Sequence, residues 1–207
     1  TFLDNARYSD MLEIDGKRLH TAIRYGLTQA LLDATALSRQ ITKAEVILDE
    51  YHLPLIAEPV PLFGQSGDDR YSAVDKMLLK DVDALPHGLI NNVPDKLGYK
   101  GEKLEEYIRW LVARVEKLRT RPDYRPCLHI DVYGTIGLIF DQDANRVADY
   151  IAGLEKAAGS LDLYIEGPVD AGSKEAQIEE LGKITRRLQE LGSPIKLVAD
   201  EWCNTFE

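Results

Sequence analysis

The sequence is poor in cysteine and in long apolar runs, and each shortage excludes a class of protein. Among its 207 residues are 2 cysteines, Cys127 and Cys203, whose spacing matches no metal or redox motif. We expect both thiols to be reduced, as is usual in a cytoplasmic protein. No apolar run approaches the roughly 18 residues that a membrane-spanning helix needs, and no secretion signal begins at Thr1. We therefore expect a cytoplasmic protein without a membrane span.

Basic residues are also few relative to acidic ones. The chain has 25 Lys and Arg against 35 Asp and Glu, which gives a formal net charge of −10. Such a surface repels the phosphates of nucleic acids and anionic lipids, so we expect neither as a partner. A Gly-x-Gly-x-x-Gly motif is missing as well, which removes support for a dinucleotide-binding sheet.

The first part of the chain has the periodicity of helices. Apolar residues recur at steps of three and four between positions 19 and 37, which predicts an amphipathic helix. Its apolar face is expected to comprise Leu19, Ile23, Leu27, Ala30, Leu31, Ala34 and Leu37. Thr42 and Glu45 have the spacing of a capping box, which predicts a second helix. Prolines then interrupt residues 54–61, and we place a domain boundary there, after residue 57.

Beyond the boundary, short apolar segments alternate with amphipathic ones. Strands are expected at residues 60–63, 85–90, 127–132, 161–165 and 196–199, with helices between them. This alternation predicts βαβ units and a parallel sheet. Five strands complete an open doubly wound sheet, whereas an eight-stranded barrel needs about three more units, roughly 100 residues. Strand spacing alone leaves both architectures open.

Each of the last three expected strands ends in an acid. The acids are Asp131, Glu166 and Asp200, spaced 35 and 34 residues apart. Because the carboxyl ends of parallel strands face one side of the fold, these side chains should converge. Convergent carboxylates repel one another unless a cation lies between them, and oxygen ligands suit a hard divalent ion. The pattern therefore predicts a Mg²⁺ site.

A simpler explanation is that each acid is a helix N-cap or a loop residue. Three consecutive acids at equal spacing favour the metal site, and Glu166 is a poor N-cap. Two aromatic residues, Tyr133 and Trp202, lie beside two of the acids. They are expected either to line the pocket or to pack beneath it.

Further polar side chains lie near the same strand ends. His87 can act as a general base near neutral pH, or it can be a hydrogen-bonded loop histidine. His129 lies two residues before Asp131 and on the same side of its strand. It can be a core residue, a metal ligand or a partner of a ligand. Gln65 follows the first strand, where an amide can orient a substrate carboxylate, although a turn is the simpler account.

Longer motifs run almost from end to end of the chain. They are Arg-Leu-His-Thr-Ala-Ile-Arg-Tyr-Gly (18–26), Gln-Ser-Gly-Asp-Asp-Arg-Tyr (65–71), Leu-Pro-His-Gly-Leu-Ile-Asn-Asn-Val (85–93), His-Ile-Asp-Val-Tyr-Gly-Thr-Ile-Gly (129–137), Ile-Glu-Gly-Pro (165–168) and Val-Ala-Asp-Glu-Trp-Cys-Asn-Thr (198–205). Together with the acids they resemble the enolase superfamily and, within it, the methylaspartate ammonia-lyase family. The resemblance implies the first βα units of a TIM-type barrel, about five, over residues 58–207. It also implies the helical C-terminal part of an α+β capping domain over residues 1–57.

The resemblance also implies roles for individual residues. Asp131, Glu166 and Asp200 match the Mg²⁺ ligands, His87 a general base or acid on the (R)-face of the substrate's C3, and Gln65 a residue that binds a substrate carboxylate. The implied reaction is the reversible elimination of ammonia from 3-methylaspartate to give mesaconate, a step in glutamate degradation. K⁺ is implied as an activating monovalent cation, and the assembly as a homodimer.

Two further features bear on the choice of function, one in favour of the ammonia-lyase and one that leaves alternatives open. Other superfamily members carry Lys-x-Lys where this chain has His87, which favours the ammonia-lyase over a cycloisomerase or a racemase. The family's principal base, a lysine on the sixth strand, is expected beyond Glu207. The alternatives are therefore a non-catalytic piece with a structural or interaction role, or another superfamily reaction.

Overall fold

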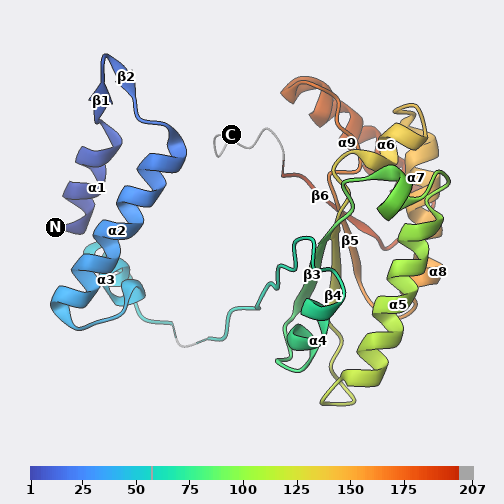
Figure 1. Ribbon diagram of the computed structural model, residues 1–207, viewed down its shortest axis with the longest axis horizontal. Helices are drawn as coiled ribbons and strands as arrows, with labels where there is room; N and C mark the ends of the chain where they lie inside the picture. The colour runs from blue at the N-terminus through green and yellow to red at the C-terminus, as the bar shows by residue number, and fades with distance from the viewer. Residues whose placement is uncertain (57, 201–207) are drawn as a thin grey trace. The chain divides into compact units, whose positions relative to one another are not determined.

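The computed structural model describes residues 1–56 and 58–200. The chain forms two compact units, Thr1–Pro59 and Val60–Glu207 (Figure 1). The expectations for Trp202 and Cys203 lie outside the described residues. Within the described part, none of the helices has the length and apolar character needed to cross a membrane.

The first unit consists, in its described part, of helices and a short hairpin. Its elements are α1 (Phe2–Asp10), β1 (Glu13–Ile14), β2 (Lys17–Arg18), α2 (Thr21–Arg39) and α3 (Lys43–Glu50). Helix α3 begins with the predicted capping box, in which Thr42 Oγ1 accepts from the Glu45 N–H at 3.2 Å and Glu45 Oε2 accepts from the Thr42 N–H at 2.7 Å. The hairpin was not predicted, although Asp15 and Gly16, with φ of 53° and 70°, suit the tight turn that joins its strands.

The predicted helix over residues 19–37 is present as α2, but its expected apolar face is wrong. Ile23 and Leu37 are 53% and 71% exposed. The buried cluster of this unit comprises Phe2, Leu32, Ala36 and Val46. Helices α1 and α3 both pack against α2, and they meet the stripe that contains Leu32 and Ala36. Periodicity identified the helix but could not tell which of its apolar stripes these neighbours cover.

The second unit is an α/β layer. Its elements are α4 (Ser72–Leu78), β3 (Ala84–Leu89), the π-helix η1 (Val93–Leu97), α5 (Glu102–Leu118), β4 (Cys127–Asp131), α6 (Thr135–Ile139), α7 (Ala144–Gly153), α8 (Glu155–Ala158), β5 (Leu163–Glu166), α9 (Lys174–Glu190) and β6 (Lys196–Val198). The described strands pair in parallel in the order β3-β4-β5-β6. Sequential strands are neighbours throughout, as in a barrel, whereas a doubly wound sheet reverses its order. The predicted α/β class with a parallel sheet is confirmed.

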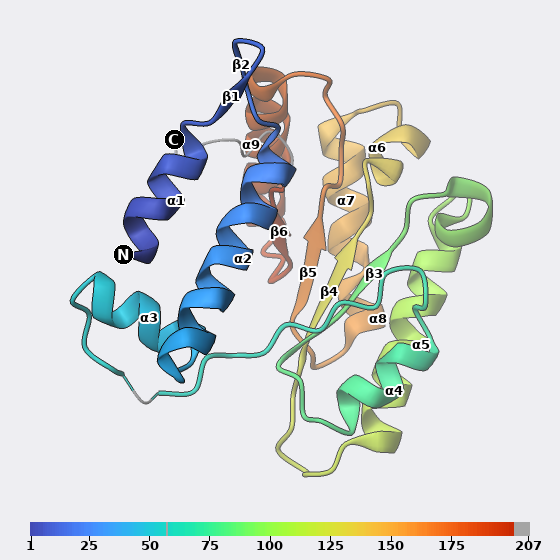
Figure 2. The same cartoon turned by 60° about the vertical axis from the view of Figure 1, so that its left-hand side comes forward.

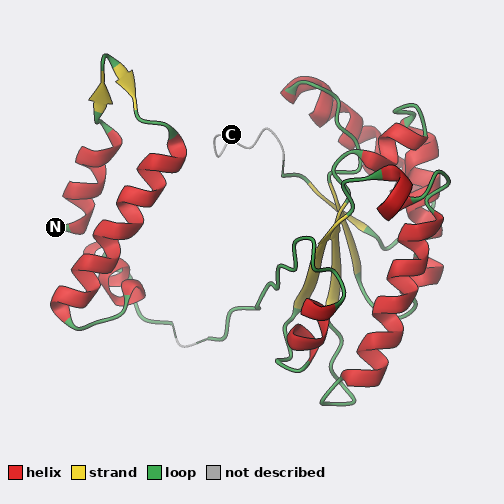
Figure 3. Cartoon of the chain, in the orientation of Figure 1, coloured by secondary structure: helices red, strands yellow, loops and turns green. Residues whose placement is uncertain are grey.

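The helices lie together on one face of this sheet (Figures 2 and 3). Alternate strand residues are apolar and almost wholly buried against that layer; they include Leu128, Ile130, Leu163 and Ile165. The residues between them point to the opposite face; they include His129, Asp131, Tyr164 and Glu166. The period of two therefore separates a core face from a polar face.

The first predicted strand, residues 60–63, is wrong as a regular strand. It is reduced to one isolated bridge, which joins Phe63 to Ala84 of β3. Pro61 has no N–H to donate to a ladder, which explains the interruption. The segment still follows β3, because the Ser66 N–H donates to the Pro86 carbonyl at 2.8 Å.

Leu111 gives a test of this core. Its side chain is 0% exposed on α5, so we expect Leu111→Ala to lower the free energy of unfolding by about 2–5 kcal/mol through lost contacts and a residual cavity. Leu79→Ala removes the same atoms from a residue that is 61% exposed and should cost less than about 0.5 kcal/mol. Urea denaturation followed by circular dichroism measures both, and equal losses would contradict the packing described.

Candidate metal centre

Two of the three predicted metal ligands are buried at neighbouring strand ends. Asp131 is the last residue of β4 and Glu166 the last of β5, and they are 5% and 6% exposed. They are register partners, and Glu166 also pairs with Val198 on β6. Asp200 follows Val198 by two residues and is exposed. The parallel register thus brings the ends of all three strands to one edge of the sheet.

A bulge in β3 brings His87 to the same place. Pro86 pairs with His129 and Gly88 pairs with Ile130, so His87 has no register partner on β4. In a regular ladder His87 would oppose Ile130 and point toward the helices. The extra residue, with φ of 45°, instead re-aims the imidazole toward the polar face. Gly88 then occupies the helix side, where a Cβ would lie 3.0 Å from the Tyr107 hydroxyl.

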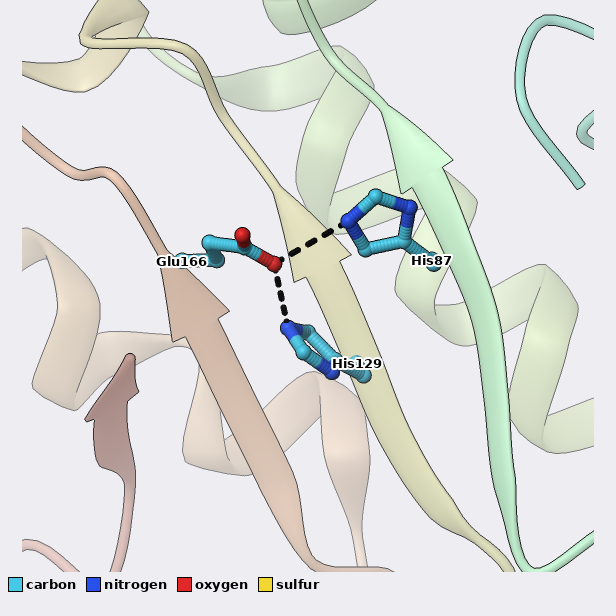
Figure 4. A group of neighbouring side chains, drawn as sticks. All are labelled: His87, His129 and Glu166. Carbon is cyan, nitrogen blue, oxygen red and sulfur yellow. Dashed lines mark hydrogen bonds and ion pairs between the residues drawn. The ribbon is translucent and has the colours of Figure 1, made fainter. Parts of the chain in front are cut away.

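Two histidines converge on one carboxylate oxygen (Figure 4). Glu166 Oε2 lies 2.6 Å from His129 Nε2 and 3.1 Å from His87 Nε2. His87 Nε2 is also 3.8 Å from Asp131 Oδ2. Nδ1 of His87 is buried and has no hydrogen-bond partner among the described residues. His87, His129 and Glu166 therefore offer ligand atoms that all lie within 4.8 Å of one another.

The electrostatics of the cluster follow from its burial. Desolvation raises the pKa of Glu166 above its usual value; the charge of His87 opposes this rise and the carboxyl of Asp200 adds to it. Burial, together with the neighbouring His87, lowers the pKa of His129 to about 4. His129 is therefore neutral at neutral pH, and its contact with Glu166 is a hydrogen bond from a neutral imidazole.

An aromatic ring and a backbone amide hold the cluster in place. The Phe63 ring lies 5.4 Å from the His87 ring and 4.9 Å from the His129 ring. Gln65 is exposed and lies two residues further along the same segment. The backbone N–H of Tyr133, whose side chain is 52% exposed, donates to Asp131 Oδ1 at 3.1 Å.

The chemistry of these donors fits a divalent cation. Two buried carboxylates lie beside a third. Burial and the neighbouring Asp200 carboxyl raise the pKa of Glu166, and a bound cation would offset both effects. Carboxylate oxygens are the ligands that Mg²⁺ prefers, with water or substrate completing its coordination. Imidazole nitrogens suit softer transition metals better. The carboxylates and the histidines thus define two competing ligand sets at one strand edge.

Comparison with known families identifies the chain's relationship. The family model described as the methylaspartate ammonia-lyase N-terminus matches residues 1–52, and the model described as the C-terminus matches residues 54–207. The chain belongs to the methylaspartate ammonia-lyase family. The resemblance seen in the sequence motifs is thereby confirmed.

Individual members of the family agree with this assignment. The methylaspartate ammonia-lyases of Citrobacter amalonaticus and Clostridium tetanomorphum are 66% and 54% identical to this chain over 206 residues, which is 100% of the chain and 50% of each relative. The crystal structure of the Citrobacter enzyme containing (2S,3S)-3-methylaspartic acid matches with a TM-score of 0.89 over 98% of this chain and 49% of that one. The Mg complex of the Clostridium enzyme matches with a TM-score of 0.85 over the same shares of the two chains. The chain thus spans about half the length of the curated relatives it matches.

The sequence pointed to most of the cluster but not to its tightest contact. His87, Asp131 and Glu166 meet, and Asp200 acts on Glu166. A partner of a metal ligand was one of three interpretations left open for His129, but its contact with Glu166 was not predicted. Its place two residues before Asp131 already put it on the correct face of the strand. The bulge at His87 had a weaker signal, a proline and a glycine flanking the histidine within a predicted strand.

Proposed function

We propose that this chain forms the first part of the active site of a methylaspartate ammonia-lyase, which reversibly eliminates ammonia from 3-methylaspartate to give mesaconate. One observation carries the proposal: His87, Glu166 and Asp131 meet at one edge of a parallel sheet in a chain of this family. The substrate is a small amino acid, as in the Citrobacter enzyme, whose structure contains (2S,3S)-3-methylaspartic acid.

Asp131, Glu166 and Asp200 are the proposed ligands of Mg²⁺. Support comes from the burial of Asp131 and Glu166, from the position of all three acids at the ends of neighbouring strands, and from the Mg complex of the Clostridium relative. When bound, the ion neutralises the charge that develops on a substrate carboxylate as the neighbouring carbon loses its proton. The carboxylates position it, and the burial of Asp131 and Glu166 strengthens their effect.

His87 is the proposed general base or acid on the (R)-face of C3, and Gln65 the proposed ligand of a substrate carboxylate. The re-aimed imidazole, which touches Glu166 and is largely shielded from water, supports the first role. A histidine suffices as a base here because a cation stabilises the product of proton removal. The position of Gln65, exposed and two residues beyond Phe63, whose ring lies 5.4 Å from the His87 ring, supports the second role.

Further parts of the assignment stay predictions. They are a capping domain over residues 1–57, a barrel domain over residues 58–207, K⁺ as an activator, a homodimer and a cytoplasmic location. A lysine base on the sixth strand of the barrel, which follows the strand labelled β6 here, is expected outside this chain. Catalysis is therefore proposed for the full-length protein that carries this lysine.

Metal removal tests the proposed function. Full-length protein supplied with Mg²⁺ should convert 3-methylaspartate to mesaconate, followed by the ultraviolet absorbance of the new conjugated double bond. Treatment with EDTA should abolish turnover, and added Mg²⁺ should restore it, because the carboxylates act only through the cation. Turnover that survives chelation, or no turnover with Mg²⁺ present, would contradict the proposal. An isolated 207-residue chain with the activity of its longer parent would contradict the assigned role of the sixth-strand lysine.

A further inference from the structure

His129 is partly buried beside the proposed metal ligands and is not one of the three carboxylates predicted to hold the ion. It lies in the middle of β4, two residues before Asp131, on the polar face of the sheet. Its side chain is 13% exposed, and its Nε2 lies 2.6 Å from Glu166 Oε2, closer than His87 at 3.1 Å. This short contact joins β4 to β5 across the strand edge (Figure 4).

The direction of the hydrogen bond follows from the chemistry of the two groups. An ionised carboxylate can only accept, so Nε2 of His129 carries the hydrogen and donates it. A nitrogen engaged in this way has no lone pair left for a metal ion. The contact therefore makes His129 a partner of Glu166 and argues against its being a ligand.

The ring is also held by packing. Phe63 lies on it with ring centroids 4.9 Å apart, and Tyr164 is its neighbour from β5 at 6.4 Å. Because the ring is confined on both sides, the donor has a fixed position. Packing alone does not require an imidazole, because an apolar side chain would fill the same space. A polar ring shielded from water is costly unless its hydrogen bond is made. The hydrogen bond that His129 donates to Glu166 therefore explains why a histidine is found here.

We propose that His129 is a positioning residue that fixes Oε2 of Glu166, so that this carboxylate is held in a single orientation toward the divalent cation. The proposal rests on the role of Glu166 as a metal ligand given above. Partners of metal ligands restrict the orientation of the ligand before the ion binds, and they increase affinity without touching it. His129 is expected to act on metal affinity first and on turnover through it.

Two substitutions separate the donor from the packing. His129→Phe keeps a flat ring between Phe63 and Tyr164 but removes the donor. His129→Gln places an amide N–H near the position of Nε2 and so restores it. Mn²⁺ serves as the probe, because it accepts the same oxygen ligands as Mg²⁺ and is detected by electron paramagnetic resonance. Binding is measured on the full-length protein by the loss of the free Mn²⁺ signal, and near-ultraviolet circular dichroism checks the fold.

We expect His129→Phe to weaken Mn²⁺ binding about 10- to 100-fold and His129→Gln to restore most of the affinity. Spin-echo modulation spectra of the bound Mn²⁺ should show no directly coordinated nitrogen. Wild-type affinity in His129→Phe, or equal losses in both variants, would overturn the proposal. So would a coordinated nitrogen that disappears in His129→Phe, because His129 would then be a ligand.

The same Mn²⁺ titration distinguishes an error in the proposed metal site from an error in the role of His129 alone. If the wild-type protein binds no Mn²⁺, or if Asp131→Asn binds it unchanged, the carboxylate site itself is wrong and the positioning role falls with it. If Asp131→Asn loses binding while His129→Phe keeps it, the site stands and only the role of His129 is wrong.

Discussion

Asp131→Asn should abolish both metal binding and turnover in the full-length protein. Asn keeps an oxygen that can accept from the Tyr133 N–H, as Asp131 Oδ1 does at 3.1 Å, but it removes the negative charge. A bound metal ion supplies several kcal/mol of charge stabilisation, so we expect turnover to fall by about 10³-fold or more. Steady-state production of mesaconate at saturating Mg²⁺ measures the loss, and Mn²⁺ titration measures the binding.

Asp141→Asn is the matched control for this substitution. The side chain of Asp141 is 88% exposed and pairs only loosely with Arg146, at 3.2 Å. The same change of charge there should leave turnover and metal affinity unaltered, since a surface pair contributes little. Equal effects of the two substitutions would show that net charge matters and that Asp131 holds no ion.

His87→Ala should distinguish the epimers of the substrate. If His87 acts on the (R)-face of C3, its loss removes general acid–base catalysis for the (3R) epimer, which is worth about 10²–10⁴-fold. The (3S) epimer relies on a base from the opposite face and should lose far less. The ratio of kcat/KM for the two epimers, measured before and after substitution, gives the result directly.

A structural role for His87 would appear differently. Removing the bulged imidazole would then disturb Glu166, 3.1 Å away, and reduce both epimers equally. His52→Ala is the control, because His52 belongs to the first unit and is exposed. It should leave both values of kcat/KM unchanged.

Much of the fold could be predicted from periodicity, and the predictions that were wrong have physical explanations. The strands ending at Asp131 and Glu166 were located because their apolar alternation reports burial against a helix layer. The strand predicted at residues 60–63 was wrong because its apolar residues lie beside prolines, which have no N–H to donate to the hydrogen bonds of a sheet. The predicted apolar face of α2 was wrong because the sequence does not show which stripe of the helix the neighbouring helices cover.

The sequence predicted which residues form the site better than it predicted how their side chains are oriented. Equal spacing of acids at strand ends pointed to a common edge, since a parallel sheet allows few other arrangements. The orientation of His87 depends on a bulge, which shifts the register by one residue and leaves little trace in composition. The approach of His129 to Glu166 depends on the register of β4 with β5, a long-range property that the local sequence does not encode.

The central claim is that three carboxylates, and not the two histidines, hold the cation. Anomalous diffraction from crystals of the full-length protein grown with Mn²⁺ tests this claim most directly. We predict one peak bonded to oxygens of Asp131, Glu166 and Asp200 at about 2.2 Å, with no nitrogen in contact. An ion bonded to the nitrogens of His87 and His129, or no ion at this strand edge, would contradict the account.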